Sequence, residues 1–202
     1  WNQKMNLTAI EDEKEIVIKH FLDSLTIMPF AAGEAEKMLD VGTGAGFPGI
    51  PLKIMNPAAE VTLLDSLEKR IKFLREVIAA LGLEGITAVH GRAEDCGAVE
   101  TFREKFGCST ARAVAPLPVL LEYCLPFVKT GGLFIAMKGS STEEIGGSAA
   151  ALEILGGKIE DVKKLTLPFS DIKRNIIAVR KLRQTPTKYP RKPGKPSKNP
   201  LK

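Results

Sequence analysis

The sequence predicts an α/β fold in which an open, doubly wound and mostly parallel sheet of seven strands carries helices on both faces. From Met38 onward, short apolar runs alternate with longer amphipathic segments, which is the pattern of repeated strand–helix units. A glycine-rich stretch, MLDVGTGAGFPGIP at residues 38–51, directly follows the first apolar run. With 202 residues, of which 44% are hydrophobic, the chain is long and apolar enough to bury one domain core.

Seven apolar runs are predicted to be strands, and five longer segments are predicted to be helices. The strands span residues 38–41, 61–64, 86–89, 111–115, 133–137, 159–167 and 175–181. The helices span residues 11–28, the segment after the glycine loop through Met55, residues 67–81, the segment from the fourth strand to Val128, and a region near 142–155. Val17, Phe21, Leu25 and Met28 share one face of the first helix. Asp65 or Ser66 caps the third helix and Gly82 ends it, while Gly131 and Gly132 form a turn before the fifth strand.

Three segments are expected along the chain: a helical segment at 1–34, the sheet domain at 35–182, and a C-terminal arm at 183–202. The first residue is Trp1 rather than Met, so we expect the natural N-terminus to lie upstream. No signal-peptide pattern opens the chain, and the longest apolar stretch is too short to span a bilayer. Cys96, Cys108 and Cys124 have no closely spaced Cys or His partners, which argues against zinc and suits reduced thiols in the cytoplasm.

Positive charge is concentrated at the C-terminal end. Residues 180–202 contain nine Lys and Arg and no acid, whereas the rest of the chain has a net charge of −4. Five prolines in the same stretch disfavour a regular helix. The sequence therefore predicts a flexible basic arm whose natural partners are polyanions.

The glycine stretch indicates a nucleotide site, because Gly44-x-Gly46-x-x-Gly49 fits the dinucleotide fingerprint. Asp40, however, stands just before these glycines, and a carboxylate there would repel the pyrophosphate of NAD or FAD. S-adenosylmethionine (SAM) has a sulfonium and an ammonium group and no phosphate, so it suits this position better. The competing interpretation is that the glycines only form a tight turn.

Two further acids follow later strands of the predicted sheet. Asp65 ends the second strand, 23 residues after Gly42, where an acid accepts hydrogen bonds from ribose hydroxyls. Glu94 follows the third strand and is placed for adenine recognition, with Ala93 supplying backbone groups. Helix capping is the alternative role for Asp40 and Asp65. Because acids recur at three successive strand ends, we favour SAM.

Several stretches together resemble the RsmG (GidB) family of bacterial methyltransferases, which act on N7 of a guanine in 16S ribosomal RNA. They are DVGTGAGFPGIPL at 40–52, TLLDS at 62–66, KRIKFL at 69–74, GRAE at 91–94, ARA at 111–113, KHFLDSL at 19–25 and KYPRKPG at 188–194. The resemblance implies a class I SAM-dependent methyltransferase (Rossmann-like) fold and cofactor contacts from Gly42, Phe47, Ala93, Glu94 and Arg112. The predicted crevice adds Gly44 and Asp65. Family members carry additional N-terminal helical sequence.

The resemblance also implies the partners. They are 16S rRNA within the 30S subunit or its precursor, with no membrane and no metal, and we expect a monomer. Neighbouring chemistries are disfavoured, because no Asn/Asp-Pro-Pro-aromatic motif follows the fourth strand and none of the cysteines follows Pro or Thr. Guanine N7 has no proton to lose, so no catalytic base is expected. A module that binds SAM or another nucleotide as a sensor, without methyl transfer, is the alternative function.

Roles at three further places stay open. Arg112 could meet the cofactor carboxylate, an RNA phosphate or a surface acid. Lys138 could meet a substrate phosphate or only solvent. His20 and Ser24 could suggest a hydrolase, but no GxSxG elbow accompanies them, so we favour a polar helical face. The resemblance places this helix near the mouth of the site, where Lys19 or His20 could contact RNA.

Overall fold

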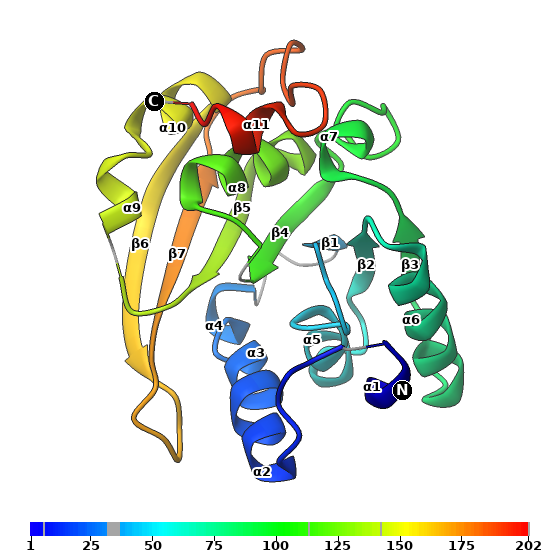
Figure 1. Cartoon of the computed structure of the whole chain (residues 1–202). Coiled ribbons are helices and arrows are strands. Elements are labelled where there is room, and N and C mark those ends of the chain that lie inside the picture. Colours follow the sequence, from blue (N-terminus) through cyan, green and yellow to red (C-terminus); the bar gives the residue numbers. More distant parts are fainter. Residues whose placement is uncertain (6, 32–36, 113, 142, 202) are drawn as a thin grey trace.

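A computed structural model of the chain describes residues 1–5, 7–31, 37–112, 114–141 and 143–201. It contains one seven-stranded sheet with the order β3-β2-β1-β4-β5-β7-β6 (Figure 1). The strands are β1 Lys37–Val41, β2 Glu60–Asp65, β3 Ile86–His90, β4 Phe106–Arg112, β5 Val128–Lys138, β6 Gly157–Thr166 and β7 Lys173–Lys181. All pairs from β3 to β5 are parallel, and β7 is antiparallel to both of its neighbours. The predicted doubly wound, mostly parallel sheet is confirmed.

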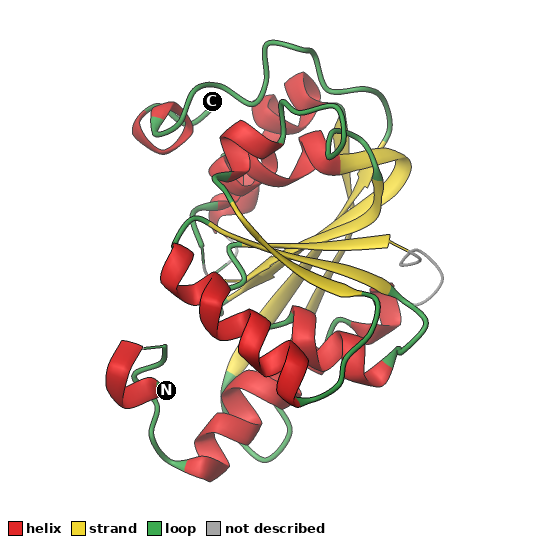
Figure 2. Ribbon diagram, turned by 90° about the vertical axis from the view of Figure 1, so that its right-hand side faces the viewer, coloured by secondary structure: helices red, strands yellow, loops and turns green. Residues whose placement is uncertain are grey.

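Helices cover both faces of this sheet (Figure 2). They are α1 Asn2–Met5, α2 Glu13–Ile16, the π-helix η1 Val17–Leu22, α3 Asp23–Leu25, α4 Met28–Ala31, α5 Gly49–Met55, α6 Glu68–Ala80, α7 Ala93–Cys96, α8 Leu117–Cys124, the 3₁₀ helix η2 Leu125–Phe127, α9 Glu143–Gly146, α10 Ala149–Leu155 and α11 Lys195–Lys198. One hydrophobic cluster joins the sheet to α5 and α6 and to Ile27, and a second joins it to α8 and α10. The central strands β1, β2 and β4 are buried along most of their length, as expected for parallel strands covered on both faces, whereas the edge strand β3 is partly exposed.

Helix α6 follows its predicted pattern closely. Ile71 and Leu74 are fully buried, whereas Leu67 and Leu81 at its two ends are exposed. The Asp65 carboxylate accepts a hydrogen bond from the Leu67 amide at 2.9 Å, and Gly82 adopts φ +60° just after the last turn. The predicted stop at Gly82 is therefore confirmed. The predicted cap is wrong, because Leu67 is the N-cap residue and no side-chain hydrogen bond from the described residues caps the helix.

The first predicted helix buries a different face from the one expected. Val17 and Phe21 are 50% and 39% exposed, while Ile18, Asp23 and Ser24 are buried. The reason is η1 in its middle, because a π-helical turn takes up more residues than an α-helical turn and shifts the phase of all that follows. A 3.6-residue period counted from Val17 was therefore wrong.

Two strands and one helix also have different bounds. β4 begins at Phe106 rather than at 111, because Ser109 and Thr110 are polar residues that lie fully buried in a central strand. Gly131 lies inside β5 instead of in a turn before it, close to a register shift opposite residues 106–108. The helix expected near 142–155 is divided into α9 and α10. Ala113, Thr142 and the predicted boundary at 34/35 lie outside the described residues.

The C-terminal arm is folded against the domain, so the prediction of a flexible arm was wrong. Thr185, Tyr189 and Pro196 are buried, and α11 lies beside α8 (Figure 1). The Arg103 guanidinium donates to the carbonyls of Thr185 at 2.6 Å and Tyr189 at 2.8 Å. These contacts join residues more than 80 positions apart, which composition alone cannot show.

The described residues also bear on the predictions about the cysteines and about membrane spans. Cys108 and Cys124 are buried and Cys96 is partly buried, as expected for small hydrophobic side chains. Among the described helices, none is both long enough and apolar enough to cross a membrane.

Candidate functional site

A crevice lies beyond the carboxyl ends of the strands, where strand order reverses between β1 and β4. It consists of two adjoining pockets that share Gly42, Asp65, Ser66 and Val114. The inner pocket is also lined by Ala93, Glu94 and Tyr123, and the outer pocket by Gly44, Phe47 and Arg112. All seven residues predicted to bind the cofactor therefore line this crevice.

The glycine loop between β1 and α5 adopts backbone conformations that other residues rarely reach. Gly42, Gly44 and Gly46 have φ values of +71°, +63° and +94°. A Cβ at Gly42 would lie 2.8 Å from a methyl group of Val114, whereas one at Gly44 would meet nothing within 4 Å. The glycines therefore let the backbone line the crevice directly.

Asp65 holds the loop from the neighbouring strand. Its Oδ2 accepts from the Gly44 amide at 2.9 Å and from Arg70 Nη1 at 3.2 Å, and its Oδ1 accepts from the Leu67 amide at 2.9 Å. A carboxylate oxygen has two lone pairs, so Oδ1 keeps one for a ligand hydroxyl. Asp65 thus combines a structural role with the geometry expected of a ribose acceptor.

Asp40 lies beneath the loop and lines neither pocket, so its expected position facing the ligand was wrong. Its Oδ2 accepts from Thr43 Oγ1 at 2.7 Å and from the Gly49 amide at 2.9 Å, while its Oδ1 is buried without a partner. Burial raises the pKa of Asp40 to about 6, against the lowering effects of these two hydrogen bonds and of Arg112. Asp40 therefore stabilises the loop by hydrogen bonds, and it makes no direct contact with a ligand in either pocket.

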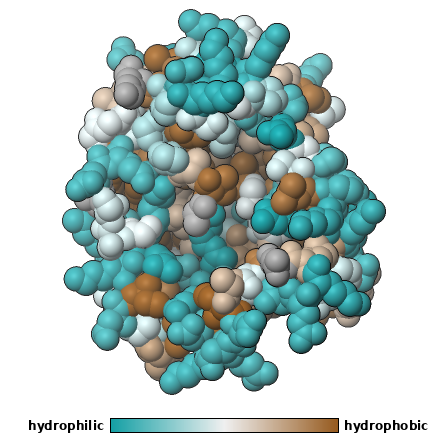
Figure 3. Space-filling view, in the orientation of Figure 1, coloured by the Kyte–Doolittle hydropathy of each residue, from teal (hydrophilic) through white to brown (hydrophobic). Residues whose placement is uncertain are grey.

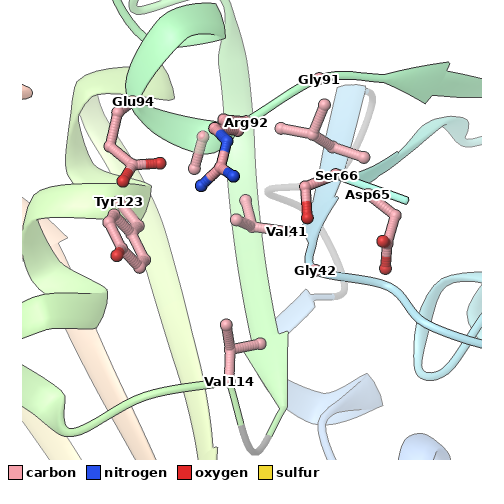
Figure 4. A pocket seen from close by; sticks show the side chains of 11 residues that line it. Val41, Gly42, Asp65, Ser66, Gly91, Arg92, Glu94, Val114 and Tyr123 are labelled. Carbon is pink, nitrogen blue, oxygen red and sulfur yellow. The ribbon is translucent and has the colours of Figure 1, made fainter. Parts of the chain in front are cut away.

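The inner pocket has an acid at each end. Figure 4 shows Glu94 and Tyr123 at one end, and Asp65 and Ser66 at the other. Glu94 is buried, and its Oε1 accepts from the Gly194 amide of the C-terminal arm at 3.1 Å. Burial raises the pKa of the Tyr123 phenol, and the charge of Glu94 raises it further. Sequence reasoning missed Tyr123 and Gly194; the only local signal was a phenol beside Glu122 in the mainly apolar α8.

Arg112 links the crevice to the N-terminal helices. Its Nη1 donates to Asp23 Oδ2 at 3.3 Å and to the Lys19 carbonyl at 3.2 Å, and its guanidinium lies 5.3 Å from the Phe47 ring centroid. Asp23 also accepts from Arg174 at 3.1 Å. At 16% side-chain exposure, Arg112 belongs to a partly buried network rather than to a surface ion pair. Asp23 and Ser24, on the predicted polar face of this helix, are buried.

His20 completes the same network. Its ring stacks on Phe47 with centroids 5.0 Å apart, and its two nitrogens lie 2.9 Å from Thr8 Oγ1 and 3.3 Å from Arg112 Nη2. Burial and the nearby Arg112 lower the pKa of His20, against the raising effect of Asp23. Because its two nitrogens have partners and its ring stacks on Phe47, His20 supports the Phe47 ring.

Two other predicted candidates lie outside the crevice. Lys138 donates to the Ala115 carbonyl at 2.9 Å and pairs with Glu144 at 2.9 Å, so it is neither solvated nor in a pocket. His90, which ends β3, also lies outside the crevice, with its Nδ1 3.1 Å from Glu68 Oε2. Among the described residues, no three His, Cys, Asp or Glu side chains form a group that could hold a metal ion.

Comparison with known proteins agrees with this fold. The ribosomal RNA small subunit methyltransferase G of Acetivibrio thermocellus is 67% identical over 201 residues, covering 100% of this chain and 83% of that protein. The protein of the same name from Alkaliphilus metalliredigens is 59% identical over 204 residues, covering 100% and 85%. A SAM-dependent methyltransferase structure from Aquifex aeolicus superposes with a TM-score of 0.61 at 17% identity, covering 86% of this chain and 96% of that one.

The structural likeness shows the class I SAM-dependent methyltransferase fold. Residues 1–177 match the sequence model of GidB, described as rRNA small subunit methyltransferase G. Together with identities of 59% and 67% across the whole chain, this match shows that the chain belongs to the GidB family.

Proposed function

We propose that the chain transfers a methyl group from SAM to N7 of a guanine in the 16S rRNA of the small ribosomal subunit. The observation that carries the proposal is the two-part crevice at the reversal of strand order, in a chain of this family. Its inner pocket lies between Asp65 and Glu94, and its outer pocket contains Arg112 and Phe47.

The residues of the crevice fit SAM. Ribose hydroxyls and the adenine amino group are hydrogen-bond donors, and Asp65 and Glu94 present acceptors at opposite ends of the inner pocket. The Arg112 guanidinium of the outer pocket suits the carboxylate of an amino acid. When bound, SAM supplies an electrophilic methyl group on a sulfonium.

The chain's own residues need to position the guanine rather than remove a proton from it. N7 carries a free lone pair, so its attack on the methyl group needs no general base. His20, the histidine of the outer pocket, is occupied at both nitrogens and at one ring face, which supports a positioning role. Alignment of reacting groups can contribute roughly 7–11 kcal/mol to lowering the barrier.

The partner and setting belong to the same proposal. The substrate is 16S rRNA in the 30S subunit or its precursor, and the enzyme acts in the cytoplasm as a monomer. Residues 35–182 bind the cofactor, the segment 1–34 stands at the mouth of the crevice, and the arm 183–202 adds affinity for RNA. Lys192, Lys195 and Lys198, here called the arm lysines, are exposed and support this last role.

Incubation with labelled SAM and 30S subunits tests the proposal directly. We expect label in 16S rRNA, recovered as 7-methylguanine after digestion, and a single-turnover rate that stays flat between mild acid and mild base. SAM binding without transfer would instead indicate a sensor module. A steep rise of the rate with pH, removed by mutation of one residue, would show that a base is required and that N7 is not the target.

A further inference from the structure

The C-terminal arm is anchored to the domain by a buried ion pair. The Arg191 guanidinium donates from Nε to Glu122 Oε1 at 2.8 Å and from Nη2 to Oε2 at 2.5 Å, and the Arg191 amide donates to Oε1 at 2.8 Å. The Glu122 side chain is only 1% exposed. Such a many-point contact fixes the arm on α8 in one position.

Just after Arg191, the arm contacts the end of the inner pocket that contains Glu94 and Tyr123. The Gly194 amide donates to Glu94 Oε1 at 3.1 Å, in a backbone conformation, φ +80°, that favours glycine. A hydrogen bond with Ser197 lowers the pKa of Tyr123, against the raising effects of burial and Glu94, so this side chain also has a partner in the arm. Both residues at this end of the pocket are therefore held by the arm.

The arm also packs on the helix that carries Glu94. A Cβ at Gly97, the residue after α7, would lie 3.1 Å from Pro190 Cγ. Arg103 Nη1 donates to both the Gly97 carbonyl at 3.0 Å and the Tyr189 carbonyl at 2.8 Å. The arm is thus joined to Gly97, three positions after Glu94, both by direct packing and through Arg103.

We propose that the C-terminal arm is a structural part of the nucleoside-binding site, which positions Glu94 and Tyr123 for the adenosine of the cofactor. This inference rests on the proposed function, since it assigns the inner pocket to that adenosine. Glu94 is a buried carboxylate whose hydrogen-bond partners include the Gly194 amide of the arm and Tyr123, and without the arm it is free to turn toward water. The arm then has two sides: an inner side that shapes the cofactor pocket and an outer side that carries the arm lysines.

The test compares two chains that share one substitution. The first ends at Tyr189 and carries Glu122→Gln, so that no charged carboxylate is left buried without Arg191. The second is the full chain with Glu122→Gln alone. Adenosine and S-adenosylhomocysteine are titrated into each by calorimetry, and urea unfolding verifies that both chains are folded.

We expect the shortened chain to bind both ligands about 3- to 10-fold more weakly than its control, the loss of about one hydrogen bond's net contribution. The two ligands share the adenosine, so both lose the same factor. The full chain with Gly194→Ala, which strains the same amide without adding a clash, is expected to weaken both ligands in the same direction.

Each other result has a distinct meaning. Affinities within twofold of the control in both variants would overturn the inference while leaving the proposed function intact. Weaker binding of S-adenosylhomocysteine with unchanged binding of adenosine would place the effect at the amino-acid end and would also overturn it. A wild-type chain that binds neither ligand would contradict the proposed function itself.

Discussion

Replacement of Arg191 by Ala should destabilise the protein far more than removal of an ordinary surface charge. The structure places four donor–acceptor contacts between Arg191 and a Glu122 side chain that is 1% exposed, and the substitution removes all except the backbone one. A buried carboxylate left without its partner typically costs about 3–5 kcal/mol. Because the arm can detach and let water reach Glu122, we expect the lower end, about 3 kcal/mol.

Thermal unfolding followed by circular dichroism measures this loss. For a domain of this size, about 3 kcal/mol corresponds to a fall in Tm of roughly 6–12 °C. The matched control is the double variant Glu122→Leu/Arg191→Leu, which removes both charges and should recover most of the lost stability. A single variant within 1–2 °C of the wild type, or a double variant as unstable as the single one, would refute the view that this pair anchors the arm.

Four further outcomes are expected. Asp65→Ala should weaken S-adenosylhomocysteine binding in calorimetry by at least about tenfold, because the loop amide of Gly44 and the ribose both lose an acceptor; tight NAD binding by the wild-type chain would contradict the cofactor assignment. The pKa of Asp40 is raised in the folded state to about 6 from 3.8, so the native state holds this proton longer and stability falls as pH rises from about 4 to 6. The free energy of unfolding of Asp40→Asn should therefore rise relative to that of the wild type by up to about 3 kcal/mol between pH 4 and 7, as measured by urea unfolding. A stability difference that does not change with pH would mean that the pKa of Asp40 is not raised in the folded state. Changing the three arm lysines to Gln should flatten the slope of log affinity for 16S rRNA against log salt by up to about 2–3 while leaving adenosine binding unchanged; an unchanged slope would exclude phosphate contacts there. Arg112→Lys should reduce single-turnover methylation of 30S subunits without creating a pH dependence, because Lys cannot hold Asp23, the Lys19 carbonyl and the Phe47 ring together, and wild-type rates would show that this network is dispensable.

Local patterns in the sequence were sufficient for the sheet and for the candidate site residues. The apolar runs of β1 and β2 are short and bounded by polar residues, and both strands are buried along most of their length, as such runs predict. Gly42, Gly44, Asp65 and Glu94 stand at strand ends, and in a parallel sheet all such ends lie at one edge. That geometric rule, rather than any long-range information, brought these residues to one crevice.

The tertiary structure alone decided how polar and charged groups are paired. Glu122 and Arg191 are 69 positions apart, and Glu94 and Gly194 are 100 apart, so no periodicity or spacing connects them. From composition, Arg191 was interpreted as one more positive charge of a flexible arm. Asp23 was assigned to a polar helix face. The sequence does not show whether a charged side chain is solvated or paired with a buried partner. Which partner it meets depends on how the whole chain packs. The sequence therefore determined where the backbone lines the crevice. The folded structure determined which side chains are positioned there and which partners hold them. The reason is that the free-energy cost of burying a charge depends on its neighbours in three dimensions.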